Sequence, residues 1–207
     1  MEQKSNPFQK SLDIKKGRIK SCLLNILKFK MSLYLFLNIA SFFIPFLYSF
    51  ENRMRYIKRW KVVFSALLIT ALFFIIWDII FTKIGVWSFN PRYHTGIKFF
   101  ELPIEEWLFF ICIPYSSIFI HYAFHYFCPT VSLSNQTVRR IYQLLLLILV
   151  PTILMHFDKW YTVINYSILV LVLTYTFYKE THILNTFFIT FLIILIPFAI
   201  VNGILTG

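Results

Sequence analysis

Long apolar runs, separated by short polar or basic connectors, dominate the sequence. A helix needs about 20 apolar residues to cross the hydrocarbon core of a bilayer, and six runs approach or reach that length. We predict membrane-spanning helices at residues 32–50, 62–82, 102–127, 141–157, 161–178 and 183–205. The pattern therefore predicts an all-α, polytopic integral membrane helix bundle with about six transmembrane helices.

The connectors between these runs alternate in charge and composition. Residues 51–61, 128–140 and 179–182 fall on one side of the predicted bundle and hold eight Lys and Arg residues, whereas 83–101 and 158–160 hold four. The positive-inside rule places the first set in the cytoplasm. The segment 83–100 is aromatic and contains Pro and Gly, so we expect it to fold back over a site.

An imperfect internal repeat is visible in the apolar runs. The Phe73-Phe74-Ile75 sequence that leads to Gly85 resembles the Phe187-Phe188-Ile189 sequence that leads to Gly207. We expect a three-helix domain at residues 31–127, a linker at 128–140 and a second, incomplete copy at 141–207. Membrane proteins built from repeats often place a site at the repeat interface.

Composition supports a membrane protein and localises much of the charge. Of 207 residues, 58% are hydrophobic, 20% aromatic and only 14% charged, with a net charge of +11. Residues 1–30 hold eight Lys and Arg residues against two acids. We interpret them as an interfacial basic extension, or as a segment upstream of a native start at Met31. Such a segment suits anionic lipid, and no nucleic-acid-binding motif accompanies it.

Three carboxylates, Asp78, Glu105 and Glu106, lie within predicted spans. A charge at the bilayer centre costs ~2.5–3.5 kcal/mol on insertion scales, so such acids are usually paired or functional. Pro103 can occupy the first turn of a helix, which would place Glu105 and Glu106 where the helix dipole favours negative charge. Capping therefore competes with a catalytic role. Asp78 either belongs to a site or forms a structural ion pair with Lys83 or Arg92.

Other polar residues give weaker signals. His121 and His125 are four residues apart, but no third ligand accompanies them, so we predict no metal site. Asn38 and Asn202 suit helix packing. Cys22, Cys112 and Cys128 form no paired motif and are expected to be free thiols. No nucleotide-binding glycine motif is present, and no cofactor is predicted.

Several motifs together resemble a known family. They are Trp77-Asp78, Gly85-x-Trp87-x-Phe89-Asn90-Pro91, Gly96-Ile97 and Leu102-Pro103-Ile104-Glu105-Glu106-x-x-Phe109-Phe110. These residues look like the membrane-integral, small-subunit type of lycopene cyclase from carotenoid-making bacteria. The resemblance is strong over residues 31–127 and weak beyond them. It implies an enzyme of the bacterial inner membrane that converts the acyclic ends of lycopene into β-ionone rings without redox change.

The implied reaction needs an acid, a dry cavity and a base. Crowded carboxylates suit it, because one group can hold a proton while the other stays charged. We assign Glu106 as the acid and Glu105 as its base or orienting partner, with the reverse assignment left open. The aromatic side chains can stabilise a carbocation or, alternatively, anchor the protein in lipid. Predicted substrate-binding residues are Trp87, Phe89, Asn90, Pro103, Trp107, Phe109 and Phe110.

The resemblance also exposes a departure from the family pattern. Each copy of the family's three-helix domain carries a Pro-x-Glu-Glu/Asp motif, which is filled here by Pro103, Glu105 and Glu106. The second copy reaches Gly207 before a counterpart occurs. We expect either a truncated reading frame or a homo- or hetero-oligomeric partner that supplies the second motif. An inactive membrane subunit and an intramembrane prenyltransferase are the rival interpretations, although Asp13, Asp78 and Asp158 are not clustered as the latter requires.

Overall fold

Six α-helices make up most of the part of the chain that the structure describes. The computed structural model describes residues 32–91 and 93–206. The helices are α2 (Leu33–Tyr48), α3 (Trp60–Lys83), α4 (Ile104–Phe127), α5 (Asn135–Met155), α6 (Trp160–Lys179) and α7 (Thr181–Thr206). The 3-10 helix η1 (Tyr56–Arg59) precedes α3, and strands β1 (Lys98–Phe99) and β2 (Leu102–Pro103) precede α4. The predicted extension at 1–30 lies outside the described residues.

The predicted all-α membrane bundle is confirmed. Five helices of the described chain are long and apolar enough to cross a membrane, beginning with the continuous η1–α3 segment, and α2 is a shorter apolar helix of 16 residues. All helix boundaries except the start of α5 lie within about two residues of prediction, and two of the differences have a clear local cause. Helix α5 begins at Asn135 rather than 141, because Ser134 caps it by accepting the Thr137 N–H. Pro103 precedes α4 in an extended conformation instead of forming its first turn.

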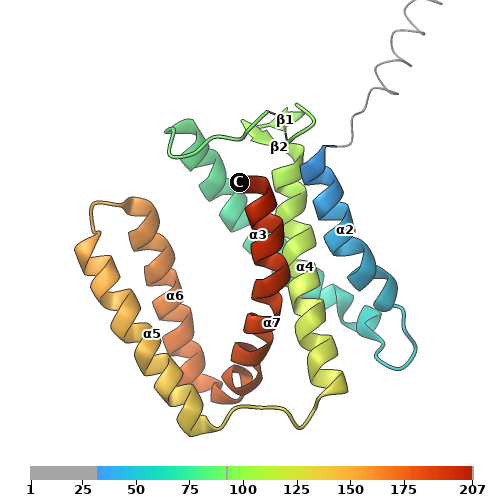
Figure 1. Cartoon of the computed structure of the whole chain (residues 1–207), viewed down its shortest axis with the longest axis vertical. Coiled ribbons are helices and arrows are strands. Elements are labelled where there is room, and N and C mark those ends of the chain that lie inside the picture. The colour runs from blue at the N-terminus through green and yellow to red at the C-terminus, as the bar shows by residue number, and fades with distance from the viewer. Residues whose placement is uncertain (1–31, 92, 207) are drawn as a thin grey trace, which may run out of the picture.

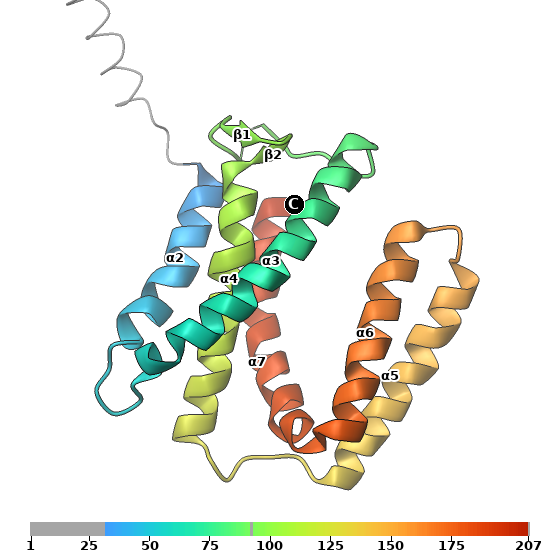
Figure 2. The same cartoon turned by 180° about the vertical axis from the view of Figure 1, so that it is seen from behind.

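The helices form two groups that meet along α7. Helices α2, α3 and α4 pack together, α5 and α6 form an antiparallel pair, and α7 packs against α4, α5 and α6 (Figure 1). The predicted basic connectors, α2 to α3, α4 to α5 and α6 to α7, share the lower end in the view of Figure 1. The aromatic connector 84–103 and the α5–α6 turn share the opposite end, which Figure 2 shows from behind.

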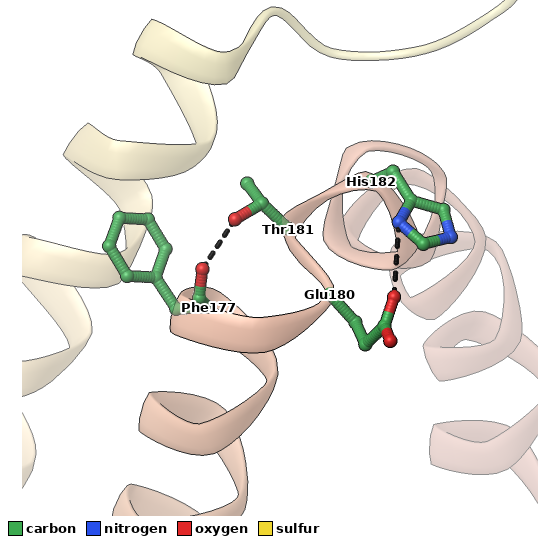
Figure 3. Close-up of polar contacts among 4 residues, drawn as sticks. All are labelled: Phe177, Glu180, Thr181 and His182. Carbon is green, nitrogen blue, oxygen red and sulfur yellow. Dashed lines mark hydrogen bonds and ion pairs between the residues drawn. The ribbon is translucent and has the colours of Figure 1, made fainter.

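Helix ends follow local chemistry. Gly85 follows the end of α3 and has a φ of +75°. The Gly85 N–H donates to the Thr82 carbonyl, and the Val86 N–H donates to the Phe81 carbonyl. This is the Schellman arrangement, which favours glycine at the position with positive φ. At the α6–α7 turn, Thr181 Oγ1 donates to the Phe177 carbonyl oxygen, and exposed Glu180 lies 3.4 Å from His182 (Figure 3).

An aromatic core holds α2, α3 and α4 together near their lower ends. Tyr56 and Tyr115 are fully buried there, and Phe64 stacks on Tyr115 with ring centroids 5.5 Å apart. The Tyr115 hydroxyl lies 2.5 Å from Ser49 Oγ and accepts the indole N–H of Trp60 at 3.1 Å. The Tyr115 ring is thus fixed by both packing and hydrogen bonds, and this core holds the three helices together at the end opposite the aromatic connector.

Candidate active site

A short β-hairpin sets the start of α4 and hence the position of its acidic residues. Lys98 pairs with Pro103 and Phe99 with Leu102, leaving Phe100 and Glu101 as a two-residue turn with φ +50° and +69°. Positive φ at both central residues is the geometry of a type I′ turn, which is strained for residues other than glycine and asparagine. The Ile104 N–H then donates to the Ile97 carbonyl at 3.0 Å, and the helix begins.

Glu105 is a buried anchor between α4, α2 and the aromatic connector. Its side chain is fully buried, and its Oε1 accepts Ser32 Oγ at 2.8 Å and the Thr95 N–H at 2.6 Å. Its backbone carbonyl accepts the side-chain amide of Asn38, which is also buried, at 2.8 Å. The Ser32 hydroxyl makes two hydrogen bonds, because it donates to Glu105 and also caps α2 by accepting the Leu35 N–H. Glu105 therefore joins three chain segments.

Glu106 points to the other side of the helix start, into a cavity. Tyr34, in the first turn of α2, donates its hydroxyl to Glu106 Oε2 at 2.6 Å. The Tyr34 backbone N–H donates to the Tyr93 carbonyl at 3.2 Å, which ties the beginning of α2 to the connector. The Glu106 carboxyl group is thus oriented by a phenol whose own position is fixed.

The cavity has a volume of about 680 Å³ and lies below the aromatic connector. Its size falls in the usual range for small-molecule sites, roughly 300–1,000 Å³. Asp78 of α3 is largely buried and faces this cavity, where it hydrogen-bonds with the Trp87 side chain and interacts electrostatically with Glu106. The lining residues are Tyr34, Asp78, Trp87, Ser88, Phe89, Asn90, Tyr93, His94, Pro103, Glu106, Phe109, Tyr161, Phe198 and Asn202.

The structure brings most of the predicted site residues to one cavity and separates three from it. Asp78, Glu106, Trp87, Phe89, Asn90, Pro103 and Phe109 line the cavity, whereas Glu105, Trp107 and Phe110 do not. Trp107 and Phe110 instead pack against the buried cluster of Ala71, Ile75 and Leu102. For Asp78, the structure gives a hydrogen bond with Trp87, and no ion pair with Lys83 occurs in the described chain; Arg92 lies outside it.

Several lining residues were missed from the sequence. Tyr34 had no motif signal, and only its helical position places its hydroxyl beside Glu106. His94 belongs to the aromatic connector; its Nδ1 accepts the Gly96 N–H, and its buried Nε2 has no hydrogen-bond partner in the described chain. Tyr161, Phe198 and Asn202 come from α6 and α7, so both helix groups contribute to the cavity.

The histidine pair on α4 lies away from this cavity. His121 Nδ1 is 2.7 Å from Thr190 Oγ1 of α7, and His125 is exposed. Among the described residues, no group of three His, Cys, Asp or Glu side chains is arranged to hold a metal ion. His121 therefore joins α4 to α7 through a hydrogen bond.

Comparison with known protein families decides the relationship. A family model described as lycopene cyclase matches residues 31–124 and 158–207. The chain belongs to the lycopene cyclase family. The matched residues include all of α2 and α3, most of α4, and all of α6 and α7, but not α5.

Family membership and the membrane-type helices support a cyclase-type enzyme integral to the membrane. Neither curated proteins nor solved structures show a match to this chain. The two cavity acids, Asp78 and Glu106, lie within the first matched region of the lycopene cyclase family, and the cavity residues Tyr161, Phe198 and Asn202 lie within the second.

Proposed function

We propose that this protein cyclises the ends of lycopene, or of a related acyclic carotenoid, to β-ionone rings by proton-initiated chemistry without redox change. The observation that carries the proposal is the placement of two carboxyl groups, Glu106 and Asp78, in one aromatic cavity of an integral membrane protein. Proton addition followed by proton loss leaves the substrate's composition unchanged. Such an isomerisation needs only an acid, a base and exclusion of water.

Glu106 is the acid in this proposal. It gives a proton to the terminal double bond of the substrate, and the electrons of a second double bond close the ring on the resulting cation. The ring cation then loses a different proton to a carboxylate, which forms the ring double bond. Tyr34 orients Glu106 through its 2.6 Å hydrogen bond, so that the acidic oxygen faces the cavity.

Asp78 is the base that removes the ring proton. It shares the cavity and hydrogen-bonds with Trp87, which fixes its orientation. The alternative base, Glu105, is less suitable because its carboxyl group is turned toward Ser32 and Thr95. We therefore propose that Glu105 is a positioning residue that holds the first turn of α4 against α2.

Aromatic rings around the acids stabilise the cationic intermediate. Trp87, Phe89 and Phe109 line the cavity with the two carboxyl groups. The face of an aromatic ring attracts a cation by ~0.5–2 kcal/mol, with the larger values in desolvated sites. Several faces in one dry cavity would lower the barrier to ring closure and keep water from capturing the cation.

The substrate is expected to reach the site through the bilayer in which it dissolves. The basic connectors lie at the end of the bundle opposite the aromatic connector, whose residues line the cavity. We infer from the positive-inside rule that the cavity lies toward the outer leaflet of a bacterial inner membrane. Neither nucleic acid nor a soluble partner is needed. An oligomeric partner carrying a second Pro-x-Glu-Glu/Asp motif remains part of the proposal.

Expression in lycopene-accumulating bacteria tests this function. Pigments are extracted and separated by chromatography from cells with the wild-type chain, Glu106→Gln, Asp78→Asn or Glu180→Gln. Glu180 is an exposed carboxylate on the α6–α7 turn and serves as the matched control. We expect cyclic carotenoid from wild type and Glu180→Gln, and a loss of about 10²–10⁴-fold in the two cavity variants, the usual contribution of general acid–base catalysis.

The outcomes separate the alternatives. Full cyclisation by both Glu106→Gln and Asp78→Asn would refute the acid–base assignment. Unchanged lycopene with a well-inserted wild-type chain would indicate the inactive or partner-dependent subunit. Coexpression with a chain that carries the second motif would then restore product only in the partner-dependent case.

A further inference from the structure

A second cavity lies beside the candidate active site, between α2, α4 and α7. We call it the lateral groove, and its volume is about 300 Å³. The residues that matter here are Ala40 and Ile44 of α2, Ile113 and Ser117 of α4, and Ile194 and Phe198 of α7. Ile44 is 62% exposed and Phe198 is 38% exposed, so the groove opens on the lipid-facing side of these helices.

The lateral groove presents an apolar surface despite its serine residues. Ser117 Oγ donates to the Ile113 carbonyl at 2.9 Å, and Ser116 Oγ lies 2.7 Å from the Cys112 carbonyl oxygen and 2.9 Å from that of Ser41. These hydroxyl protons are used within and between the helices. The small side chains leave space, and the residues that line the groove carry no charge.

Phe198 links this groove with the active-site cavity. It lines both, together with Tyr34, Asp78 and Glu106 on one side and Ala40 and Ile44 on the other. The two spaces therefore meet at one aromatic side chain. The active-site cavity is lined by carboxyl groups and aromatic rings, whereas the lateral groove is lined by apolar side chains and serines.

We propose that the lateral groove binds the polyene chain of the acyclic carotenoid while its end group lies in the active-site cavity, with Phe198 at the junction between them. This proposal rests on the proposed function. A substrate much longer than its reacting end must leave the cavity somewhere, and the lateral groove shares Phe198 with the cavity and includes the lipid-facing Ile44. A long conjugated hydrocarbon makes no hydrogen bonds, so a surface lined mainly by apolar side chains suits it.

The groove also gives α7 a role in substrate selection. Ile194 and Phe198 form its α7 wall, and Phe198 and Asn202 reach the cavity from the same helix. Binding energy gained along the polyene chain would position the reacting end near Glu106. Long substrates should therefore be preferred over short ones that carry the same end group.

Tryptophan substitutions that fill the groove test this preference. Ala40→Trp blocks the groove and Phe198→Trp narrows the junction, whereas Ile39→Trp and Phe191→Trp alter neighbouring lipid-facing positions that line neither cavity. Each purified variant is given lycopene and, separately, a truncated acyclic analogue with the same end group. Lycopene that copurifies with each variant is measured by its absorbance.

We expect Ala40→Trp and Phe198→Trp to lower the ratio of kcat/KM for lycopene to that for the short analogue by about tenfold or more, equivalent to about 1.4 kcal/mol. Copurified lycopene should fall in the same two variants, and Ile39→Trp and Phe191→Trp should behave as wild type. An unchanged ratio, or equal loss of both substrates, would overturn the groove assignment. If wild type cyclises neither substrate, alone or together with a chain that carries the second motif, the proposed function fails, and selective loss of bound lycopene still tests the groove.

Discussion

The first three helices and the last three differ in how they are held together. In the first group, buried polar groups cross between helices: Asn38 binds the Glu105 carbonyl, and Ser32 binds the Glu105 carboxylate. In the second, Tyr142 stacks on Phe177 at 4.2 Å and donates to Thr174 at 3.2 Å near the lower end. The most apolar windows of α3 and α4 are each 22% buried, against 17% for α5 and 6% for α6 and α7.

The proposed catalytic residues and several other residues that line the cavity therefore come from different helix groups. Catalytic groups must be held within a fraction of an ångström, which requires side chains fixed by packing and hydrogen bonds. Asp78 and Glu106 both lie on helices of the tightly joined first group. The second group contributes Tyr161, Phe198 and Asn202, which line the same cavity.

Removing a buried interhelical hydrogen bond in the first group should have the larger effect on stability. Asn38→Leu leaves the Glu105 carbonyl without its amide donor, and we expect a loss of about 1–2 kcal/mol in unfolding free energy together with reduced cyclisation. Asn165→Leu is the matched control, because the Asn165 amide donates only within α6, to the Tyr161 carbonyl. Denaturant unfolding in detergent measures both. Equal losses of unfolding free energy in Asn38→Leu and Asn165→Leu would contradict the difference between the two helix groups.

A smaller, local effect is expected in the second group. Tyr142→Leu removes the stacking on Phe177 and the bond to Thr174, with a loss of about 0.5–1.5 kcal/mol from the aromatic pair. Hydrogen exchange should rise in α5 and α6 but not in α2 or α4. Tyr175→Leu, at a 67% exposed site on α6, should change neither. Increased exchange throughout the chain would show that the six helices unfold as one unit.

The sequence was sufficient for the helices because their signal is local. Apolar runs fixed the number of helices, and most ends follow from nearby residues such as Gly85. The two boundary errors had local causes that hydropathy does not record. Ser134 extends α5 through polar residues, and the β-hairpin keeps Pro103 extended.

The site was predictable only where residues cluster in sequence. Asp78, Glu106 and Trp87 were found because an acid in an apolar run is unusual and the motifs resemble a family. The sequence did not distinguish Glu105 from Glu106, because adjacent residues on a helix differ by about 100° in direction. Only the packing of α2 shows which one is enclosed. Tyr34 and Phe198 were missed, since their distance in sequence from the acids hides their contact.

The central claim is that a carboxyl group of this protein starts the reaction by giving the substrate a proton. Membranes containing the wild-type chain are incubated with lycopene in deuterated buffer, and the cyclic product is analysed by mass spectrometry. Since the acid exchanges with solvent and the proton lost comes from the substrate, the account predicts one deuterium in each ring formed. Rings formed without deuterium would contradict it.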